Sequence, residues 1–455
     1  MTGEEWDTIV VGAGVLGCAT AYHLKRTDPD RSVLLLDRNE RPAMGNTRRS
    51  VALFRDLFTS ATNRDLATST IAFFDHLEGE LGHKLGLRRF GYYWMLGAER
   101  LRTLEDSLAA LGGKGLDLEV HDEGEVRAML GDNLAVSPRA PEGRGPMEPV
   151  AGAVLARNAG TLSPTSLTRF YEERFRAMGG EVEYGLRVER LVPESLRGGH
   201  VRVWEDAHVT AVEGPDGRRR AKGIVVAAGA WTPHLVEPLG IDSHVQPQTR
   251  QAFGLVGDGP KGLLERNGFP GGELPVLVLP AAGVYLKPIR SQGMVLAGCA
   301  DGFGRPYGLE DDPQPEEGFL DGQIRPVLEG YLPGMRRAGV RVSWAGQYHY
   351  NTMDGNPFVF RTSNVTVVAG ASGSGIMKSD AIGRVATATS LGQGEAELFG
   401  GRGIRPWCAG PEGRARGPDD LRVPWTFSRP LFFPDWLSKL SWQSINGMSQ
   451  IDIQS

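Results

Sequence analysis

Residues 7–37 constrain more than any other stretch what this chain can fold into. Residues 8–11 form a short apolar run rich in β-branched side chains, as expected for a buried parallel strand. Residues 32–36 have the same character, and Asp37 closes them. Between the two runs lies a segment with the apolar spacing of a helix, which opens with three glycines in the pattern G-x-G-x-x-G: Gly12, Gly14 and Gly17.

The spacing of these glycines has a physical reason. The first permits a tight turn from strand to helix, the second lets the backbone approach a pyrophosphate, and the third lets the helix pack closely on the strand. The helix start, at Val15 and Leu16, offers phosphates unpaired N–H groups and a positive dipole end. An acid placed like Asp37 can accept ribose hydroxyls. An ordinary glycine-rich turn is the alternative, but this context favours a dinucleotide site.

Chain length, net charge and cysteine content limit the classes of protein to which this chain can belong. A chain of 455 residues is too long for one simple core, so two or three domains are expected. A formal charge of −5 gives no electrostatic reason to expect nucleic acid. The three cysteines are widely spaced and indicate neither a disulfide framework nor a metal site. The absence of a signal-like start and of a long apolar window predicts a cytoplasmic protein, with peripheral membrane attachment left open.

Further along, small and polar segments mark other candidate ligand contacts. Residues 45–50 form a loop in which Arg48 or Arg49 could face an anionic cofactor, and a solvated surface loop is an equal alternative. A buried strand over 223–232 ends in small residues that let the backbone lie close to a ligand. The Gly/Ser loop of residues 370–378 opens a predicted helix over 379–391, a second helix start suited to an electron-rich group.

The remaining segments predict a second domain. Aromatic strands and amphipathic helices are expected over residues 88–149, and antiparallel strands over 244–298. Residues 310–317, which read EDDPQPEE, are expected to form an exposed acidic loop. Residues 401–455 carry a polar linker followed by an unusually aromatic run.

Together these motifs resemble those of the D-amino-acid oxidase superfamily, on the branch with sarcosine oxidase, glycine oxidase and dye-linked proline dehydrogenases. The resemblance covers roughly residues 5 to 400. Beyond the glycine turn, Asp37 and the 45–50 loop, it is carried by motifs at residues 158–160, 227–231, 352–357 and 373–375.

The resemblance implies an α/β (α+β) fold, in which a Rossmann-like FAD-binding domain is interleaved with an antiparallel-sheet substrate domain. The FAD-binding domain is expected from residues 1–87, 150–240 and 341–400, and the substrate domain from 88–149 and 241–340. Residues 401–455 would be a C-terminal extension.

The resemblance also assigns residues to the cofactor. The adenosine and diphosphate would lie on the glycine turn and Asp37, with further contacts along the ribityl chain and the flavin. These further contacts are Arg38, Thr47, Arg48, Arg49, Ser50, Val188, Ala228, Gly229, Trp231, Gly373, Ser374, Gly375, Ile376 and Met377. Relatives with covalent flavin use a cysteine where this chain has Gln347, so non-covalent FAD is expected.

Four residues are candidates for binding the substrate or taking part in its reaction. Arg55 matches the family arginine that holds a substrate carboxylate, although a helix-surface arginine is the alternative. Lys378 is next to the position of a second carboxylate-binding lysine, which here is Met377. His349 and Tyr350 could face the substrate, with His349 a base for a hydroxy acid, or they could be structural.

These residues predict an FAD-dependent dehydrogenase for a small amino acid or a secondary or N-methylated amine. Leu296 is expected where the oxidases carry a lysine that promotes reaction with oxygen, which favours a dye, quinone-type or protein electron acceptor. The alternatives are a 2-hydroxy-acid dehydrogenase and a flavin-bound assembly or scaffold subunit. The aromatic tail could contact a second subunit, a membrane surface or the chain's own core.

Overall fold

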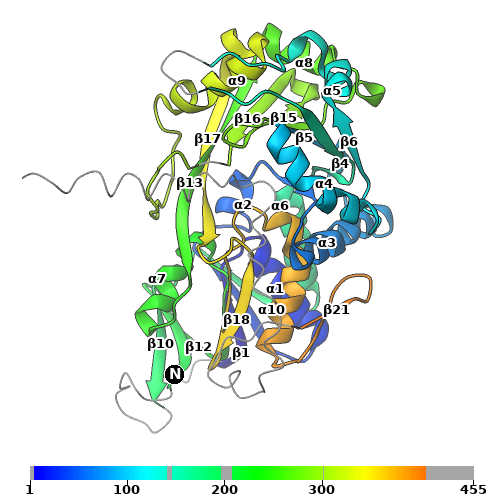
Figure 1. Cartoon of the computed structure of the whole chain (residues 1–455). Helices are drawn as coiled ribbons and strands as arrows, with labels where there is room; N and C mark the ends of the chain where they lie inside the picture. The colour runs from blue at the N-terminus through cyan, green and yellow to red at the C-terminus, as the bar shows by residue number, and fades with distance from the viewer. Residues whose placement is uncertain (1–4, 141–145, 196–206, 301, 406–455) are drawn as a thin grey trace, which may run out of the picture.

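Two eight-stranded sheets organise the molecule, and the predicted mixed α/β architecture is confirmed. The computed structural model describes residues 5–140, 146–195, 207–300 and 302–405. The first sheet forms the lower half of the view in Figure 1 and the second the upper half. The predicted aromatic tail lies outside the described residues from residue 406 onward.

The first sheet has a parallel centre that follows from its apolar runs. Its parallel strands are, in spatial order, β19 (Val365–Ala369), β12 (Gly217–Val226), β1 (Glu5–Val11), β2 (Val33–Asp37) and β9 (Glu181–Tyr184). Ile9 and Val10 are fully buried, as expected for a strand covered on both faces. Antiparallel strands extend this sheet: β18 (Phe358–Thr362) on β19, and β11 (Ala207–Gly214) with β10 (Arg190–Ser195) on β12.

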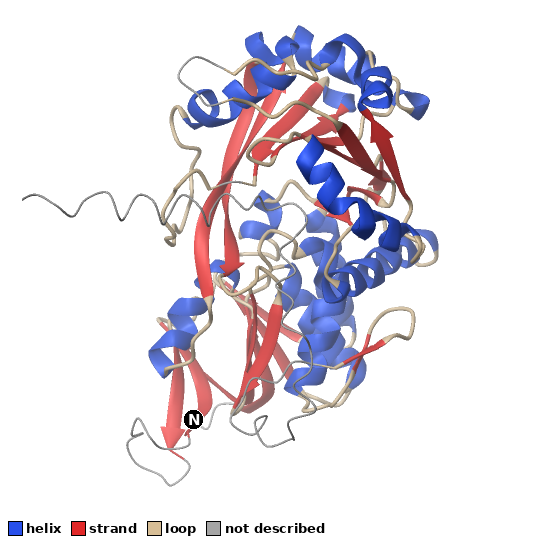
Figure 2. Cartoon of the chain, viewed as in Figure 1, coloured by secondary structure: helices blue, strands red, loops and turns tan. Residues whose placement is uncertain are grey.

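Helices cover one face of this sheet (Figure 2). They are α1 (Val15–Thr27), α3 (Ala61–Gly79), α6 (Pro164–Ala177) and α10 (Ser379–Ser390). α1 contacts both α10 and α6, and the approach to α10 is close because Gly383 faces the backbone of Ala19. A buried ion pair joins the same two helices, with 2.8 Å between His23 Nε2 and Asp380 Oδ1. These contacts hold the start of α1, and with it the glycine turn, against the sheet.

The second sheet is antiparallel except where β14 pairs with β5. Its spatial order is β17 (Gly339–Asn351), β13 (Val245–Val256), β16 (Met294–Cys299), β15 (Val284–Ile289), β14 (Val276–Val278), β5 (Tyr92–Leu96), β7 (Gly152–Ala156) and β6 (Leu118–Asp122). Four helices accompany it: α4 (Ala98–Gly112), α5 (Glu123–Leu130), α8 (Asp258–Glu265) and α9 (Arg325–Tyr331). The paired strands β13 and β17 run from this sheet toward the first one (Figure 1).

The strand pairing divides the chain differently from the boundaries expected above. β7 is hydrogen-bonded between β5 and β6, so residues 152–156 lie in the second sheet although 150–240 were assigned to the cofactor-binding part. Residues 341–351 of β17 likewise pair with β13. A small third sheet, β3 (Leu53–Arg55), β8 (Ala159–Thr161) and β4 (Arg88–Arg89), lies where the chain passes between the two parts.

Local structure departs from the sequence pattern at three places. The strand expected over 181–191 divides into β9 and β10, because Gly185 adopts a φ of 76° that ends the extended run. The 45–50 loop contains a short helix, α2 (Asn46–Arg49), and α8 interrupts the strands expected over 244–298. Within the described ranges, none of the helices combines the length and apolar character needed to cross a membrane.

Candidate cofactor and substrate site

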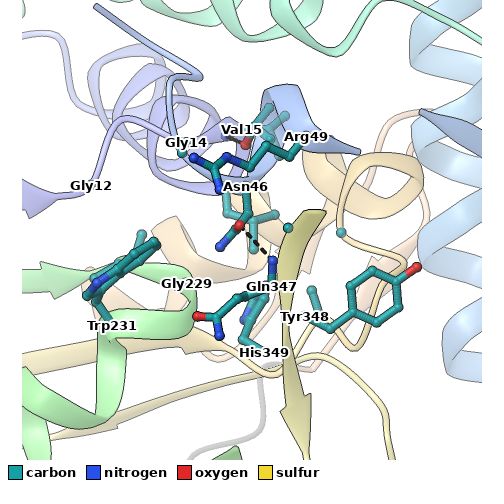
Figure 3. A pocket seen from close by; sticks show the side chains of 18 of the residues that line it. Gly12, Gly14, Val15, Asn46, Arg49, Gly229, Trp231, Gln347, Tyr348 and His349 are labelled. Carbon is teal, nitrogen blue, oxygen red and sulfur yellow. Dashed lines mark hydrogen bonds between the residues drawn. The ribbon is translucent and has the colours of Figure 1, made fainter. Parts of the chain in front are cut away.

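A cavity of about 680 Å³ lies beyond the carboxyl ends of β1, β2 and β12. Ligands in open parallel sheets bind at this edge. Its walls come from segments that are distant in sequence, from Val11 to Ile376. Figure 3 shows this convergence, with the glycine turn above, Trp231 at the lower left and β17 to the right of both.

The glycine turn is shaped by close backbone contacts. Gly12 has a φ of 107°, and an added Cβ there would lie 2.6 Å from the carbonyl oxygen of Ala227. An added Cβ on Gly17 would overlap the carbonyl oxygen of Gly12. The Thr47 hydroxyl accepts a hydrogen bond of 3.1 Å from Val15 N, which satisfies one N–H at the start of α1. The turn therefore has no room for side chains at its first and third glycines.

Asp37 and Arg38 lie side by side at the end of β2. The Asp37 carboxylate accepts hydrogen bonds from Ala13 N at 2.6 Å and Asn39 N at 2.8 Å, so it braces the turn. The Arg38 guanidinium stacks 4.1 Å from the ring centroid of Trp231, which belongs to the short helix η2 (Gly229–Trp231). All of these residues except Ala13 line the cavity.

Helix α2 joins the two sheets across the cavity. Asn46 Oδ1 accepts a 2.8 Å hydrogen bond from Gln347 N on β17 (Figure 3). Trp344 Nε1 donates to the carbonyl oxygen of Arg49 at 2.6 Å. The Arg49 guanidinium in turn donates to the carbonyl oxygen of Ala345. The early loop and β17 therefore form one continuous wall.

The acidic loop predicted over residues 310–317 is largely exposed, as expected, and it also makes ion pairs along this wall. The Asp311 carboxylate lies 3.0 Å from Arg38 Nη1 and accepts a 2.8 Å hydrogen bond from Trp231 Nε1. The neighbouring Asp312 forms an ion pair with Arg49. Leu309 and Asp311 line the cavity. The pKa of Asp311 is lowered by the hydrogen bonds from Trp231 and Arg38, so this carboxylate is ionised near neutral pH.

Behind the cavity, two cations contact one aromatic ring. The ring centroid of Phe58 lies 4.1 Å from Arg55 Cζ and 4.4 Å from Lys378 Nζ. Lys378 is fully buried and donates to two neutral groups, Asn63 Oδ1 at 2.6 Å and Ser374 Oγ at 2.8 Å. Burial, with a smaller effect of Arg55, lowers the pKa of Lys378. Burial also lowers the pKa of Arg55, to about 10.

The residues that the sequence singled out for the cofactor fall into two sets. The cavity lining contains Gly12, Gly14, Val15, Leu16, Asp37, Arg38, Thr47, Arg49, Ser50, Val188, Ala228, Gly229, Trp231, Gly373, Gly375 and Ile376. Outside the lining, Gly17 packs on the turn, Met377 packs in the helix-side core, and Ser374 accepts from Lys378. Arg48 also lies outside it, beside the sulfur of Met44.

His349 and Tyr350 occupy opposite faces of β17. His349 projects into the cavity on the same side of the strand as Gln347, and Tyr348 projects to the other side (Figure 3). His349 Nδ1 is buried without a hydrogen-bond partner in the described structure, and desolvation lowers the pKa of His349 to about 4. Tyr350 lies outside the lining, and its hydroxyl accepts a 2.8 Å hydrogen bond from Arg250 Nη2.

A buried cation missed by the sequence reasoning lies opposite Leu296. In the register of β15 and β16, Leu296 pairs with Lys287, whose Nζ donates to Val51 O at 2.6 Å and Thr161 Oγ1 at 2.7 Å. Val51 lines the cavity, so an ammonium group stands directly behind its wall. Burial lowers the pKa of Lys287 to about 8. The inference that this region lacks a cation was therefore wrong. The sequence feature that could have revealed this cation is a single lysine within an otherwise uncharged strand.

Comparison with known proteins agrees with this architecture. A model of the family described as FAD dependent oxidoreductase matches residues 7–389. FAD-dependent oxidoreductase domain-containing protein 1 of Bos taurus is 24% identical over 439 residues, covering 84% of this chain and 80% of that protein. Monomeric sarcosine oxidase of Bacillus sp. (strain B-0618) is 25% identical over 410 residues, covering 85% and 92%. L-proline dehydrogenase from P. horikoshii has a similar structure, with a TM-score of 0.68, 19% identity, and coverage of 86% and 94%.

The residues present fit FAD. The cradle formed by Gly12 and Gly14 leaves space for a diphosphate against the start of α1, and Arg38 and Arg49, which are ion-paired with Asp311 and Asp312, line the same cavity. A dinucleotide can extend from there toward β17 and the Gly373–Gly375 loop, which line the same cavity. The chain therefore belongs to the FAD dependent oxidoreductase family, which the match over residues 7–389 shows.

Proposed function

We propose that the chain is an FAD-dependent dehydrogenase of a small amino acid or a secondary or N-methylated amine, which it oxidises to the imine. The observation that carries this proposal is the pair of buried cations around Phe58, Arg55 and Lys378. A guanidinium can hold a substrate carboxylate through two parallel hydrogen bonds, and an ammonium group can add a third. A carboxylate bound here would take the place of the contact with the ring of Phe58.

The chain's residues would position and desolvate the amine rather than transfer protons. When bound, the flavin supplies the group that accepts a hydride, and with it two electrons, from the carbon next to nitrogen. His349 is neutral near pH 7 because of its low pKa, which suits a cavity that receives a neutral amine. The carboxylate held by Arg55 and Lys378 would orient the substrate so that its amine-bearing carbon faces the cofactor.

We further propose an electron acceptor other than oxygen. Lys287 does not line the cavity, and two of its three N–H donors are taken by Val51 O and Thr161 Oγ1. A cation held in this way by protein oxygens is poorly placed to stabilise reduced oxygen species in the cavity. A dye, a quinone or a partner protein would then take the electrons.

The FAD is proposed to be held without a covalent bond. Gln347 occupies the position of the flavin-linked cysteine of some relatives, and its carboxamide donates to Gly308 O at 2.8 Å. A carboxamide cannot form the thioether that a cysteine forms. Precipitation of the purified protein with acid is therefore expected to release the flavin into the supernatant. Yellow colour retained in the washed pellet would contradict this expectation.

Anaerobic bleaching of the flavin absorbance tests the proposed function. The panel is proline, sarcosine, glycine, both enantiomers of common amino acids, lactate and 2-hydroxyglutarate. Bleaching by an amine, with fast reoxidation by a dye and slow reoxidation by air, is the expected result. Bleaching by hydroxy acids alone would instead assign the chain to 2-hydroxy-acid oxidation, with His349 as the base to test. Rapid peroxide formation in air would refute the non-oxygen acceptor, and no bleaching by any donor would refute the enzyme itself.

A further inference from the structure

Arg250 is a cation in the cavity wall that no carboxylate of the described residues neutralises. It lies on β13 and lines the cavity. Its guanidinium donates to neutral acceptors: Thr249 O at 3.1 Å, Ala300 O at 3.2 Å and Tyr350 OH at 2.8 Å. Its Nε atom is buried and has no hydrogen-bond partner among the described residues. Within these residues the guanidinium is therefore held by neutral groups alone.

Other half-buried arginines at or near the cavity differ in this respect. Arg38 pairs with Asp311, and Arg49 pairs with Asp312. The neighbouring Arg305, which also donates to Thr249 O, pairs with Glu316 at 2.6 Å. Arg187 also lines the cavity, but its side chain is exposed to solvent. A half-buried arginine with no carboxylate partner among the described residues is a candidate for binding an anionic ligand group.

Tyrosines surround this guanidinium and extend toward Arg55. The ring centroids of Tyr348 and Tyr350 lie 5.7 Å and 5.2 Å from Arg250 Cζ. Tyr285 and Tyr348 line the cavity. The pKa of Tyr285 is raised by burial and influenced by Tyr348, Tyr92 and Arg250. The pKa of Tyr92, also raised by burial, is influenced by both Arg55 and Tyr348.

Tyr92 stacks on Trp94, whose ring lies 5.4 Å from Arg55 Cζ, and Tyr92 and Tyr285 pack in one hydrophobic cluster. Together with Tyr348, which lies beside Arg250, these tyrosines form what we call the tyrosine wall. It has basic groups at both ends, the Arg55–Lys378 pair and Arg250. Because burial raises the pKa values of these tyrosines, their hydroxyls stay protonated and can donate hydrogen bonds to an anion. The wall is apolar in its rings and polar at its hydroxyls, so it suits a short aliphatic chain with an acidic group at each end.

We infer that the substrate is a small amine or amino acid that carries two carboxylates, and that Arg250 binds the second one. This inference rests on the proposed function for the first carboxylate. It narrows the substrate class to an acidic amino acid or an amine bearing two carboxymethyl-type groups. Arg250 would act as a specificity-determining residue, because a substrate with one carboxylate leaves its charge unpaired.

Binding of unreactive ligands to the holoenzyme tests this without requiring turnover. Glutarate is compared with butyrate, which is glutarate with one carboxylate replaced by hydrogen, by perturbation of the flavin absorbance. A charge-assisted hydrogen bond contributes about 1.5–3 kcal/mol, so glutarate should bind roughly 10- to 100-fold more tightly than butyrate. In Arg250→Gln this ratio should fall to near one, and Arg250→Lys should restore part of it. Arg305→Gln is the matched control and should keep the wild-type ratio.

Three results would overturn the inference. The wild-type protein could bind glutarate and butyrate equally well. Arg250→Gln could weaken the binding of both acids by the same factor. Arg250→Gln could also lower the affinity for FAD, which would place the guanidinium on the cofactor. Turnover gives a second, independent test. We compare kcat/KM for iminodiacetate with kcat/KM for sarcosine, and the preference for iminodiacetate should fall about 10-fold or more in Arg250→Gln. If no amine is oxidised but glutarate binding still depends on Arg250, the proposed reaction is wrong and the second anion site is supported.

Discussion

A Gly17→Ala variant is expected to lose FAD. The added methyl group would overlap the carbonyl oxygen of Gly12, a backbone atom that cannot rotate away, so α1 must shift off β1. The start of α1 then no longer faces the diphosphate, and we expect the dissociation constant of FAD to rise at least about 100-fold, equivalent to ~2.7 kcal/mol. The overpacking itself should lower the free energy of unfolding of the apoprotein by about 1–3 kcal/mol. Fluorescence titration of apoprotein with FAD and thermal unfolding measure the two effects.

Gly79→Ala is the control for this change. Gly79 is the last residue of α3, and an added Cβ there meets no atom within 4 Å. Its backbone is helical, a conformation that alanine readily adopts. This variant should bind FAD nearly as well as wild type. Gly17→Ala protein that binds FAD within threefold of wild type would show that the turn tolerates a methyl group, contrary to the geometry.

The second large effect is expected at Arg55. An Arg55→Met variant keeps much of the side chain's bulk between Phe58 and Trp94 but removes the charge. If Arg55 holds the substrate carboxylate, the dissociation constant of the amine substrate identified by bleaching should rise roughly 10- to 100-fold. The methyl ester of the same substrate should be affected much less, because it has no charge to lose. Anaerobic titration of flavin absorbance with each compound gives the comparison.

Arg89→Met serves as the control for this variant. Arg89 lies near Phe54 on the neighbouring strand β4, but its guanidinium pairs with Asp75 at the surface. We expect its loss to leave substrate affinity unchanged. An equal loss of affinity for acid and ester in Arg55→Met would point to disturbed packing and would remove Arg55 from the proposed carboxylate site.

Local patterns predicted the first βαβ unit because its physics is local. The strand over 8–11, the glycine spacing and the second strand ending at Asp37 correspond to β1, α1 and β2. The amphipathic helix expected over 99–111 is α4, Ala98–Gly112. In each case the element is recognised from the periodicity of apolar residues or from a turn residue only a few positions away. Such short-range patterns can be read directly from the sequence.

The contacts of the acidic loop and the helix α8 could not be predicted in the same way. Asp311 and Asp312 reach Arg38 and Arg49 across more than 250 positions of sequence, and nothing in EDDPQPEE predicts that this exposed loop makes ion pairs along the cavity wall. The segment Asp258–Glu265 has a proline and two glycines among its eight residues, so its helical state depends on packing of Leu263 and Leu264 in the core. Lys287 and Arg250 are the single charged residues of their strands, and their partners come from other segments.

The position of β1 in its sheet has a consequence for how the chain is made. Val11 pairs with Leu36 on one side and with Val226 on the other. One edge of β1 therefore stays unpaired until more than 200 further residues have been synthesised. During that interval an apolar strand edge is open to pairing with other chains. The cavity lining extends to Ile376, so cofactor can bind only after most of the chain has left the ribosome. FAD therefore acts on a nearly finished protein, and the first part of the nascent chain folds before its flavin site is complete.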